Sequence, residues 1–163
     1  MSSPPLSPTL AGTLRLQGRK AIILGVANRR SLAWAAAEQL ASAGAHVALT
    51  YLDEPALKRA QPLIDAIKPA YHAPCDVRDD EQLKRVIEEA AEALGGEIDC
   101  LVHSLAFAEL NDLRAPLDAC SREGFQLAFE VSAYSLMRCV HWAKPHLAAH
   151  SSVVTMTYLG ARV

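Results

Sequence analysis

The chain has 163 residues, of which 51% are hydrophobic, and its formal net charge is −2. This length suits one domain with a substantial core, and the near balance of charge gives no basic surface for nucleic acid or an anionic membrane. No apolar run approaches the ~18 residues of a membrane span. The four cysteines are widely spaced without a C-x-x-C pair. They indicate neither a zinc site nor a disulfide framework, and they favour reduced thiols in the cytoplasm.

The first thirteen residues are rich in Ser and Pro and lack the apolar core of a signal peptide. We predict a flexible tail over residues 1–13 and one domain over residues 14–163. In that domain, short apolar runs alternate with stretches of helical periodicity. The predicted strands are 20–25, 46–51, 70–74, 99–104 and 152–157. The predicted helices are 31–43, 54–67, 80–94 and 121–142, with a possible helical turn in 105–120.

Alternation of strands and helices predicts an α/β fold: a Rossmann-like, doubly wound parallel sheet with strand order 3-2-1-4-5. Pro62 predicts a kink in the second helix or a late start of it. The last helix repeats apolar and small residues on one face, which we expect to be buried: Phe125, Phe129, Ser132, Leu136, Val140 and Ala143.

One face of the sheet is left without a helix near strands four and five. Strand five nevertheless carries apolar residues that point both ways, because Val153 and Val154 are adjacent and Met156 follows. A strand of this kind needs cover on both faces. We therefore expect a domain that is truncated after strand five.

The turn after the first strand is the strongest candidate site. An apolar run stops at Gly25, and a helical pattern begins at Ser31. A glycine turn before a helix start can bind a phosphate, because the first helical N–H groups are unpaired and the helix dipole is positive there. An ordinary turn with Ser31 as N-cap is the alternative. The strand order places Gly25, Asp76 and residues 105–108 on one rim of the sheet.

Five strings support a family resemblance: GVANRRSLAW (25–34), CDV (75–77), LVHSLAFA (101–108), VSAYS (131–135) and TMTYLGA (155–161). In this order and spacing they resemble the NADH-dependent enoyl-acyl-carrier-protein reductases, a divergent branch of the short-chain dehydrogenase/reductase superfamily. The resemblance covers about residues 16–162. It implies hydride transfer from NADH to the double bond of an enoyl thioester carried by acyl carrier protein, in fatty acid biosynthesis.

The resemblance also implies roles for single residues. Gly25, Ser31 and Leu32 match the pyrophosphate-binding turn, and Asp76 and Val77 match the pair that holds the adenine. Leu105 and Ala106 match the wall beside the cofactor ribose, Ala108 matches an acyl-substrate contact, and Tyr158 matches the first of two active-site tyrosines. Alternatives remain open for Asp76, as a loop cap for the third helix, and for Tyr158, as a tyrosine that anchors a loop.

Two departures from the family pattern matter. Leu52 stands where a polar residue is common, and the neighbouring Asp53 either binds the adenosine ribose or caps the second helix. As a ribose ligand it favours NADH over NADPH. The second tyrosine and the lysine of the relatives lie beyond Val163. We therefore expect this chain to be the N-terminal part of such a reductase and to be inactive alone. The homotetramer of the relatives is doubtful for this chain.

Two histidine features have less support as sites. His146 and His150 have the spacing of a helical metal pair, but Pro145 interrupts the helix, so we predict no metal site. His103 lies in a predicted buried strand, where a hydrogen-bonded core histidine is favoured over a catalytic base. A different short-chain dehydrogenase and a non-catalytic nucleotide-binding remnant are the alternatives to an enoyl reductase.

Overall fold

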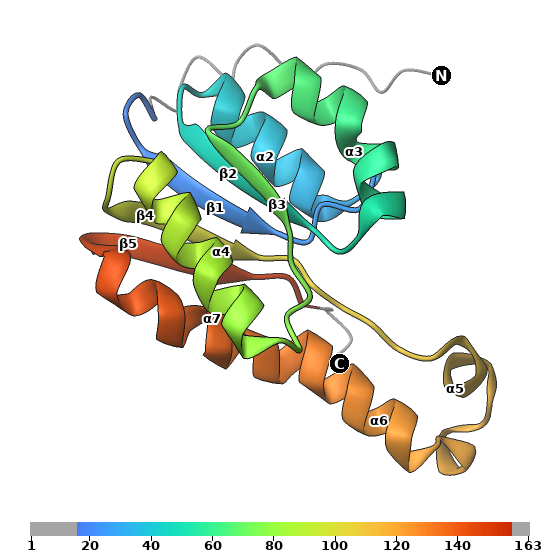
Figure 1. The fold of residues 1–163 in the computed structure, drawn as a ribbon. Coiled ribbons are helices and arrows are strands. Elements are labelled where there is room, and N and C mark those ends of the chain that lie inside the picture. The colour runs from blue at the N-terminus through green and yellow to red at the C-terminus, as the bar shows by residue number, and fades with distance from the viewer. Residues whose placement is uncertain (1–15, 158–163) are drawn as a thin grey trace.

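The computed structural model describes residues 16–157, so the predicted tail lies outside the described residues. Five strands form one parallel sheet in the order β3-β2-β1-β4-β5, which confirms the predicted topology (Figure 1). The strands are β1 (Lys20–Leu24), β2 (His46–Tyr51), β3 (Tyr71–Pro74), β4 (Ile98–His103) and β5 (Leu147–Thr155).

Helices cover the two faces of this sheet unequally. The α-helices are α2 (Leu32–Ser42), α3 (Glu54–Ile67), α4 (Asp80–Ala93), α5 (Leu110–Arg114), α6 (Arg122–Phe129) and α7 (Ser135–Ala143). Shorter helical turns are η1 (Leu117–Ala119), the π-helical turn η2 (Glu130–Tyr134) and η3 (Lys144–His146). Helices α2 and α3 pack on one face, and α4 and α7 pack on the other (Figure 1).

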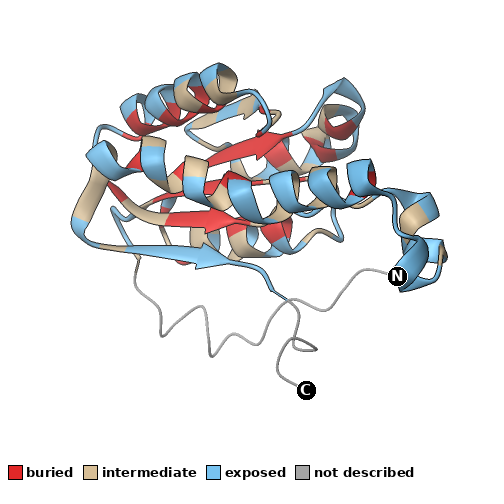
Figure 2. Ribbon diagram, turned by 90° about the horizontal axis from the view of Figure 1, so that it is seen from below, coloured by how far each residue is buried: buried red, intermediate tan, exposed pale blue. Residues whose placement is uncertain are grey.

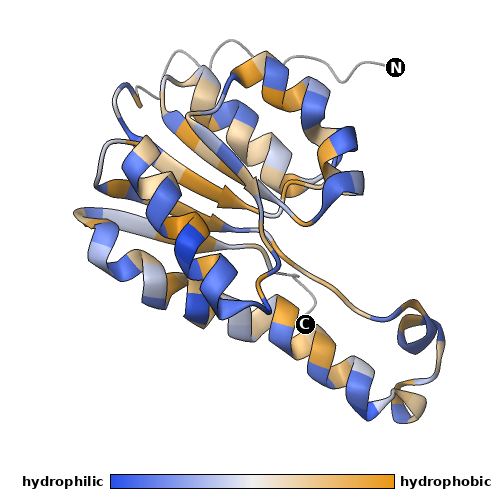
Figure 3. Ribbon diagram, in the orientation of Figure 1, coloured by the Kyte–Doolittle hydropathy of each residue, from blue (hydrophilic) through white to orange (hydrophobic). Residues whose placement is uncertain are grey.

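The core divides into two clusters because successive strand residues point to opposite faces. In β1, Ile22 and Leu24 pack toward α4 and α7, whereas Ala21 and Ile23 pack toward α2 and α3. Figure 3 shows the hydrophobic central strands between helices whose outer surfaces are hydrophilic. This is the pattern of a parallel sheet that is buried on both sides.

Capping residues set where the helices begin. Ser31, Asp53, Asp79 and Ser121 each accept a hydrogen bond from a backbone N–H in the first turn of the following helix. The cap by Asp53 makes α3 begin at Glu54, so the late start that Pro62 suggested is wrong. Pro62 lies within the helix instead.

The predicted helix over 121–142 is interrupted in its middle. The turn η2 separates α6 from α7, and a π-helical turn adds one residue, which rotates the faces on either side of it. In this segment Gly124 is buried and Leu127 and Val131 line the pocket, whereas Phe125 and Phe129 are 64% and 56% exposed, so their predicted burial is wrong. Figure 1 shows α6 extending past the carboxyl ends of the strands, away from the body of the sheet.

Strand β5 confirms the prediction of an uncovered face. It begins five residues earlier than predicted, and most of its residues are exposed (Figure 2). Val153 and Val154 are each 42% exposed, and Met156 just beyond the strand is 38% exposed. Within residues 16–157, β5 is also an edge strand without a neighbour on its outer side.

His103 is a buried, hydrogen-bonded histidine, as predicted, and its hydrogen bonds join three elements. Its Nε2 lies 2.7 Å from Ser135 Oγ in α7, and its Nδ1 lies 3.2 Å from Thr155 Oγ1 in β5. Ser135 Oγ donates to the carbonyl oxygen of Val131 at 2.7 Å, so it accepts the proton of Nε2. This network assigns a neutral ring with its proton on Nε2.

Burial lowers the pKa of His103 below its ordinary value of about 6.5. The unfolded chain therefore binds this proton more readily than the folded one, and the free energy of unfolding falls as the pH drops below ~6.5. We predict that the loss between pH 7.5 and 5.5 is smaller in His103→Gln. Urea unfolding at each pH measures this slope, which for one proton is at most about 1.4 kcal/mol per pH unit. The exposed His46 provides the control variant His46→Gln, and equal slopes in both variants would contradict the prediction.

Candidate functional site

A pocket lies at the carboxyl ends of the central strands. Its volume is about 390 Å³, and it is lined by the turn after β1, the end of β2, the start of α3, the loop before α4, the segment after β4 and one side of α6 and η2. The carboxyl ends of parallel strands at a switch in strand order are where ligands of doubly wound folds bind. Of the predicted site residues, Gly25, Asp76, Val77, Leu105 and Ala106 line this pocket.

Gly25 allows β1 and β4 to approach each other closely. Its φ angle is +94°, which residues with a side chain rarely adopt, and an added Cβ would collide with the backbone oxygen of Ser104 and with Leu105. The turn is also bound to β2, because Gly25 N–H donates to Thr50 Oγ1 at 3.2 Å and Val26 N–H donates to Thr50 O at 2.8 Å. Thr50 was missed from the sequence, where a lone hydroxyl in an apolar strand was the available signal.

Ser31 is the N-cap of α2. Its Oγ accepts from Trp34 N–H at 3.3 Å and donates to the Asn28 carbonyl at 2.7 Å. Neither Ser31 nor Leu32 is among the pocket-lining residues, and the Leu32 side chain is 63% exposed. The structure therefore contains the N-cap that was the alternative, and phosphate binding at this helix start stays a prediction.

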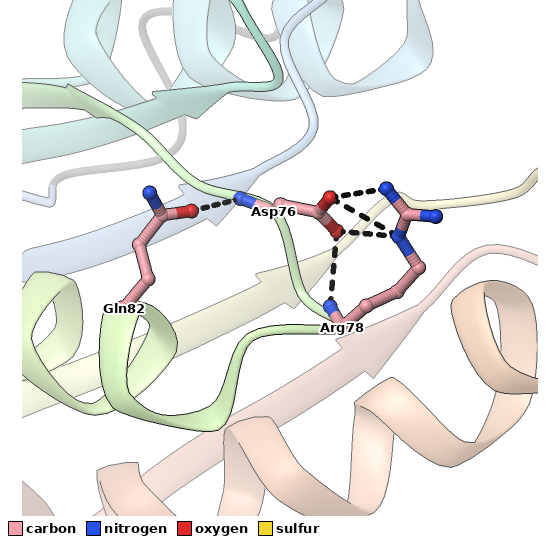
Figure 4. A network of polar contacts seen from close by, with 3 residues as sticks. All are labelled: Asp76, Arg78 and Gln82. Carbon is pink, nitrogen blue, oxygen red and sulfur yellow. Dashed lines mark hydrogen bonds and ion pairs between the residues drawn. The ribbon is translucent and has the colours of Figure 1, made fainter.

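Asp76 and Val77 occupy the loop between β3 and α4. Asp79 is the N-cap of α4, and Asp76 Oδ1 accepts from the backbone N–H of Arg78 at 3.0 Å in the loop before that helix. The structure therefore contains the loop cap that was the alternative for Asp76, and adenine binding by Asp76 stays a prediction. Figure 4 shows the Asp76 carboxylate facing the Arg78 guanidinium, while Gln82 accepts from the backbone N–H of Asp76. The hydrogen bonds from Arg78 lower the pKa of the Asp76 carboxyl, which keeps this carboxyl ionised and paired with the guanidinium.

The segment after β4 forms the opposite wall. Leu105 and Ala106 line the pocket, whereas Ala108 is half-buried outside it. The backbone of Phe107 is bound to η2, because its N–H donates to Ser132 Oγ at 3.1 Å. Tyr158, the predicted catalytic residue, lies outside the described residues.

Charged side chains of both signs surround the pocket. Asp53 lies at its rim and uses Oδ1 to accept from Ala56 N–H at 2.8 Å, as a helix cap does. Arg59 reaches back from α3 to the carbonyl of Ala27 at 3.4 Å. Together with Asp76, Arg78 and Glu109, these residues give the lining three acids and two bases. Arg59 and Arg78 carried no recognisable sequence signal, because both belong to ordinary polar stretches.

A family model described as enoyl-(acyl carrier protein) reductase matches residues 25–163. The chain belongs to this family. Curated relatives include the NADH enzyme FabI of Nostoc sp., which is 38% identical over 150 residues, and the NADPH enzyme FabI of Staphylococcus aureus, which is 38% identical over 149 residues. Each alignment covers 90% of this chain and 58% of the relative.

Solved structures of this family have the same fold. An enoyl reductase from Anaplasma phagocytophilum in complex with NAD superposes with a TM-score of 0.84 at 36% identity. The Bacillus cereus enzyme with NADP⁺ and indole naphthyridinone gives 0.84 at 37% identity. The superpositions cover 91% of this chain but 57% and 59% of those chains, so this chain spans slightly less than three fifths of its relatives. Family and Rossmann-like fold are thereby confirmed.

Two further observations concern residues 16–157. None of the helices there has the length and apolar character needed to cross a membrane. The same part of the chain contains no cluster of three or more His, Cys, Asp or Glu side chains arranged to hold a metal ion.

The close approach at Gly25 leads to a prediction for Gly25→Ala. Positive φ costs a residue with a side chain about 1–2 kcal/mol, and the collision with Ser104 adds roughly 1–3 kcal/mol. Gly96→Ala is a matched control, because Gly96 has φ +106° and nothing within 4 Å of the added Cβ. Urea unfolding of both variants measures the difference. Equal losses of stability would show that Ser104 does not constrain the turn.

Proposed function

We propose that this chain provides the dinucleotide-binding part of an enoyl-acyl-carrier-protein reductase that uses NADH. The observation that carries the proposal is the pocket itself, where the glycine turn, the loop with Asp76 and the wall at Leu105 meet at the carboxyl ends of β1, β3 and β4. In this function, bound NADH supplies the hydride that reduces the double bond of the enoyl thioester.

The residues present fit a dinucleotide. Gly25 lets the turn after β1 pack directly against Ser104 and Leu105 in the pocket lining, and α2 begins shortly after this turn. We infer that Gly25, Ser31 and Leu32 bind the pyrophosphate. The dipole of α2 and its unpaired N–H groups are the physical basis of that assignment.

The other walls of the pocket fit the adenine and the ribose of the cofactor. Asp76 offers a carboxylate that can accept from the exocyclic amine of adenine, and Val77 offers backbone groups beside it. Leu105 and Ala106 give a flat, apolar surface for the ribose, and we infer that Ala108 contacts the acyl chain. Tyr158 is proposed as the active-site tyrosine from the family resemblance alone.

NADH is favoured over NADPH by the charge of Asp53. A carboxylate at the rim would repel a 2′-phosphate, and its cap on α3 holds it in place. The relatives include enzymes named for either cofactor, so the proposed preference rests on Asp53 of this chain and not on family membership. Free thiols at all four cysteines support the proposed cytoplasmic location. Binding of acyl carrier protein also stays a prediction, and the homotetramer of the relatives stays doubtful for this chain.

Binding of NADH to the purified chain tests the proposal directly. A ligand that binds only the folded state raises the free energy of unfolding, by about 2.7 kcal/mol at one hundred times Kd. We predict a rise in the thermal unfolding midpoint that continues, in proportion to the logarithm of the NADH concentration, above Kd. An unchanged midpoint at millimolar NADH would overturn the proposed function.

Replacing Asp53 tests the cofactor preference. Asparagine caps helices as well as aspartate does, so Asp53→Asn removes the charge while keeping the start of α3. We predict that the ratio of NADPH to NADH dissociation constants falls roughly fivefold, because repulsion of the 2′-phosphate is lost. Asp65→Asn, at the far end of α3, removes the same charge outside the pocket and should leave the ratio unchanged. A ratio that is equal in both variants would rule out Asp53 as the discriminating residue.

A further inference from the structure

Asp76 and Arg78 form an ion pair inside the pocket lining. The Nε atom of Arg78 lies 3.0 Å from Oδ1 and 3.1 Å from Oδ2 of Asp76, and Nη2 lies 2.5 Å from Oδ2. The backbone N–H of Arg78 also donates to Oδ1 at 3.0 Å. A carboxylate offers about four acceptor positions, so Arg78 occupies most of those that Asp76 has.

The two partners differ in freedom of movement. The backbone of Asp76 is fixed, because its N–H donates to Gln82 and its carbonyl accepts from Asp79 N–H at 3.1 Å. The preceding Cys75 is buried and donates its N–H to the carbonyl of Tyr51 at 2.8 Å. The Arg78 side chain is 50% exposed on a flexible stem. When a ligand requires the carboxylate, the guanidinium is therefore the group that moves.

We propose that Arg78 is a displaceable latch on Asp76, which sets the affinity of the pocket for the adenine end of the cofactor. The inference rests on the proposed function, because it takes the carboxylate of Asp76 as the acceptor for the adenine amine. An incoming amine gains its acceptor only when the guanidinium leaves at least one carboxylate oxygen. Arg78 thereby acts as a competitor of adenine within the same chain.

The displacement is energetically accessible. An ion pair exposed to this degree contributes little to stability, because water and salt screen it. The carboxylate of Glu130 in η2 also lies close enough to raise the pKa of Arg78, after the larger effect of Asp76. A guanidinium released from Asp76 thus remains near a second negative charge.

The latch predicts that removal of Arg78 changes the affinity for adenine in the direction opposite to the change expected for a phosphate-containing ligand. Removing a cation from the rim of a pocket normally weakens the binding of a phosphate-containing ligand. Removing Arg78 should strengthen the binding of adenine, because the carboxylate becomes free. Adenosine carries no phosphate, so its affinity reports the release of the Asp76 carboxylate without the loss of attraction between Arg78 and a phosphate.

The experiment compares Arg78→Ala with the wild-type chain by equilibrium dialysis against adenosine, AMP and nicotinamide mononucleotide. We expect about threefold tighter binding of adenosine, the size appropriate to an exposed ion pair, and no gain for nicotinamide mononucleotide, which lacks adenine. Arg122→Ala is the matched control, because Arg122 is an exposed arginine of α6 outside the pocket lining. It should leave the affinity for adenosine unchanged.

A second background tests the pairing itself. In Asp76→Asn the charge partner of Arg78 is absent, so adding Arg78→Ala should give no further gain in adenosine affinity. Thermal unfolding of each variant verifies that it is folded. An equal gain in both backgrounds, or adenosine binding to Arg78→Ala no tighter than to wild type, would overturn the latch. Failure of the wild-type chain to bind AMP, NADH and adenosine would instead overturn the proposed function, and the latch with it.

Discussion

The site depends on the close contact between the Gly25 turn and the end of β4. The backbone of β1 turns at Gly25 directly against the carbonyl of Ser104, while Thr50 holds the same turn from β2. Three neighbouring strands therefore end at one point, and the segments that follow them diverge around a common space. Leu105 and Val26 line that space because their strands are held together one residue earlier.

The fold could be predicted from the sequence wherever a boundary has a local physical cause. Strand β2 was predicted with its observed ends, because Gly44 ends the preceding helix and Asp53 starts the next one. The position of His103 in a buried strand was also predictable, since apolar residues precede it and the parallel sheet covers both faces there. Each of these features could be predicted from residues within a few positions of the element concerned.

The features that escaped prediction arise from contacts between distant segments. The residues of η2 carry no sequence signal for a π-helical turn. Ser132 in η2 and Ser135 at the start of α7 form hydrogen bonds with Phe107 and His103, which are distant in the sequence. The early start of β5 has the same origin, since Leu147 pairs with Ile98 of β4 across a bulge. In the site, Asp76 was identified through family resemblance. Its partner Arg78 has no equivalent signal, because an arginine two residues away is common in polar loops.

The exposed edge at β5 has a consequence for the behaviour of the isolated polypeptide. Within residues 16–157, the regularly paired segment 152–155 after the bulge has no neighbour on its outer side and carries exposed valines. Folded proteins usually protect such an edge with charge, proline, a bulge or a covering segment, because an open edge can recruit a strand from another molecule. Edge-to-edge association of this chain in concentrated solution is therefore expected to begin at residues 152–155 of β5, and its kinetics would depend on that segment more than on the pocket.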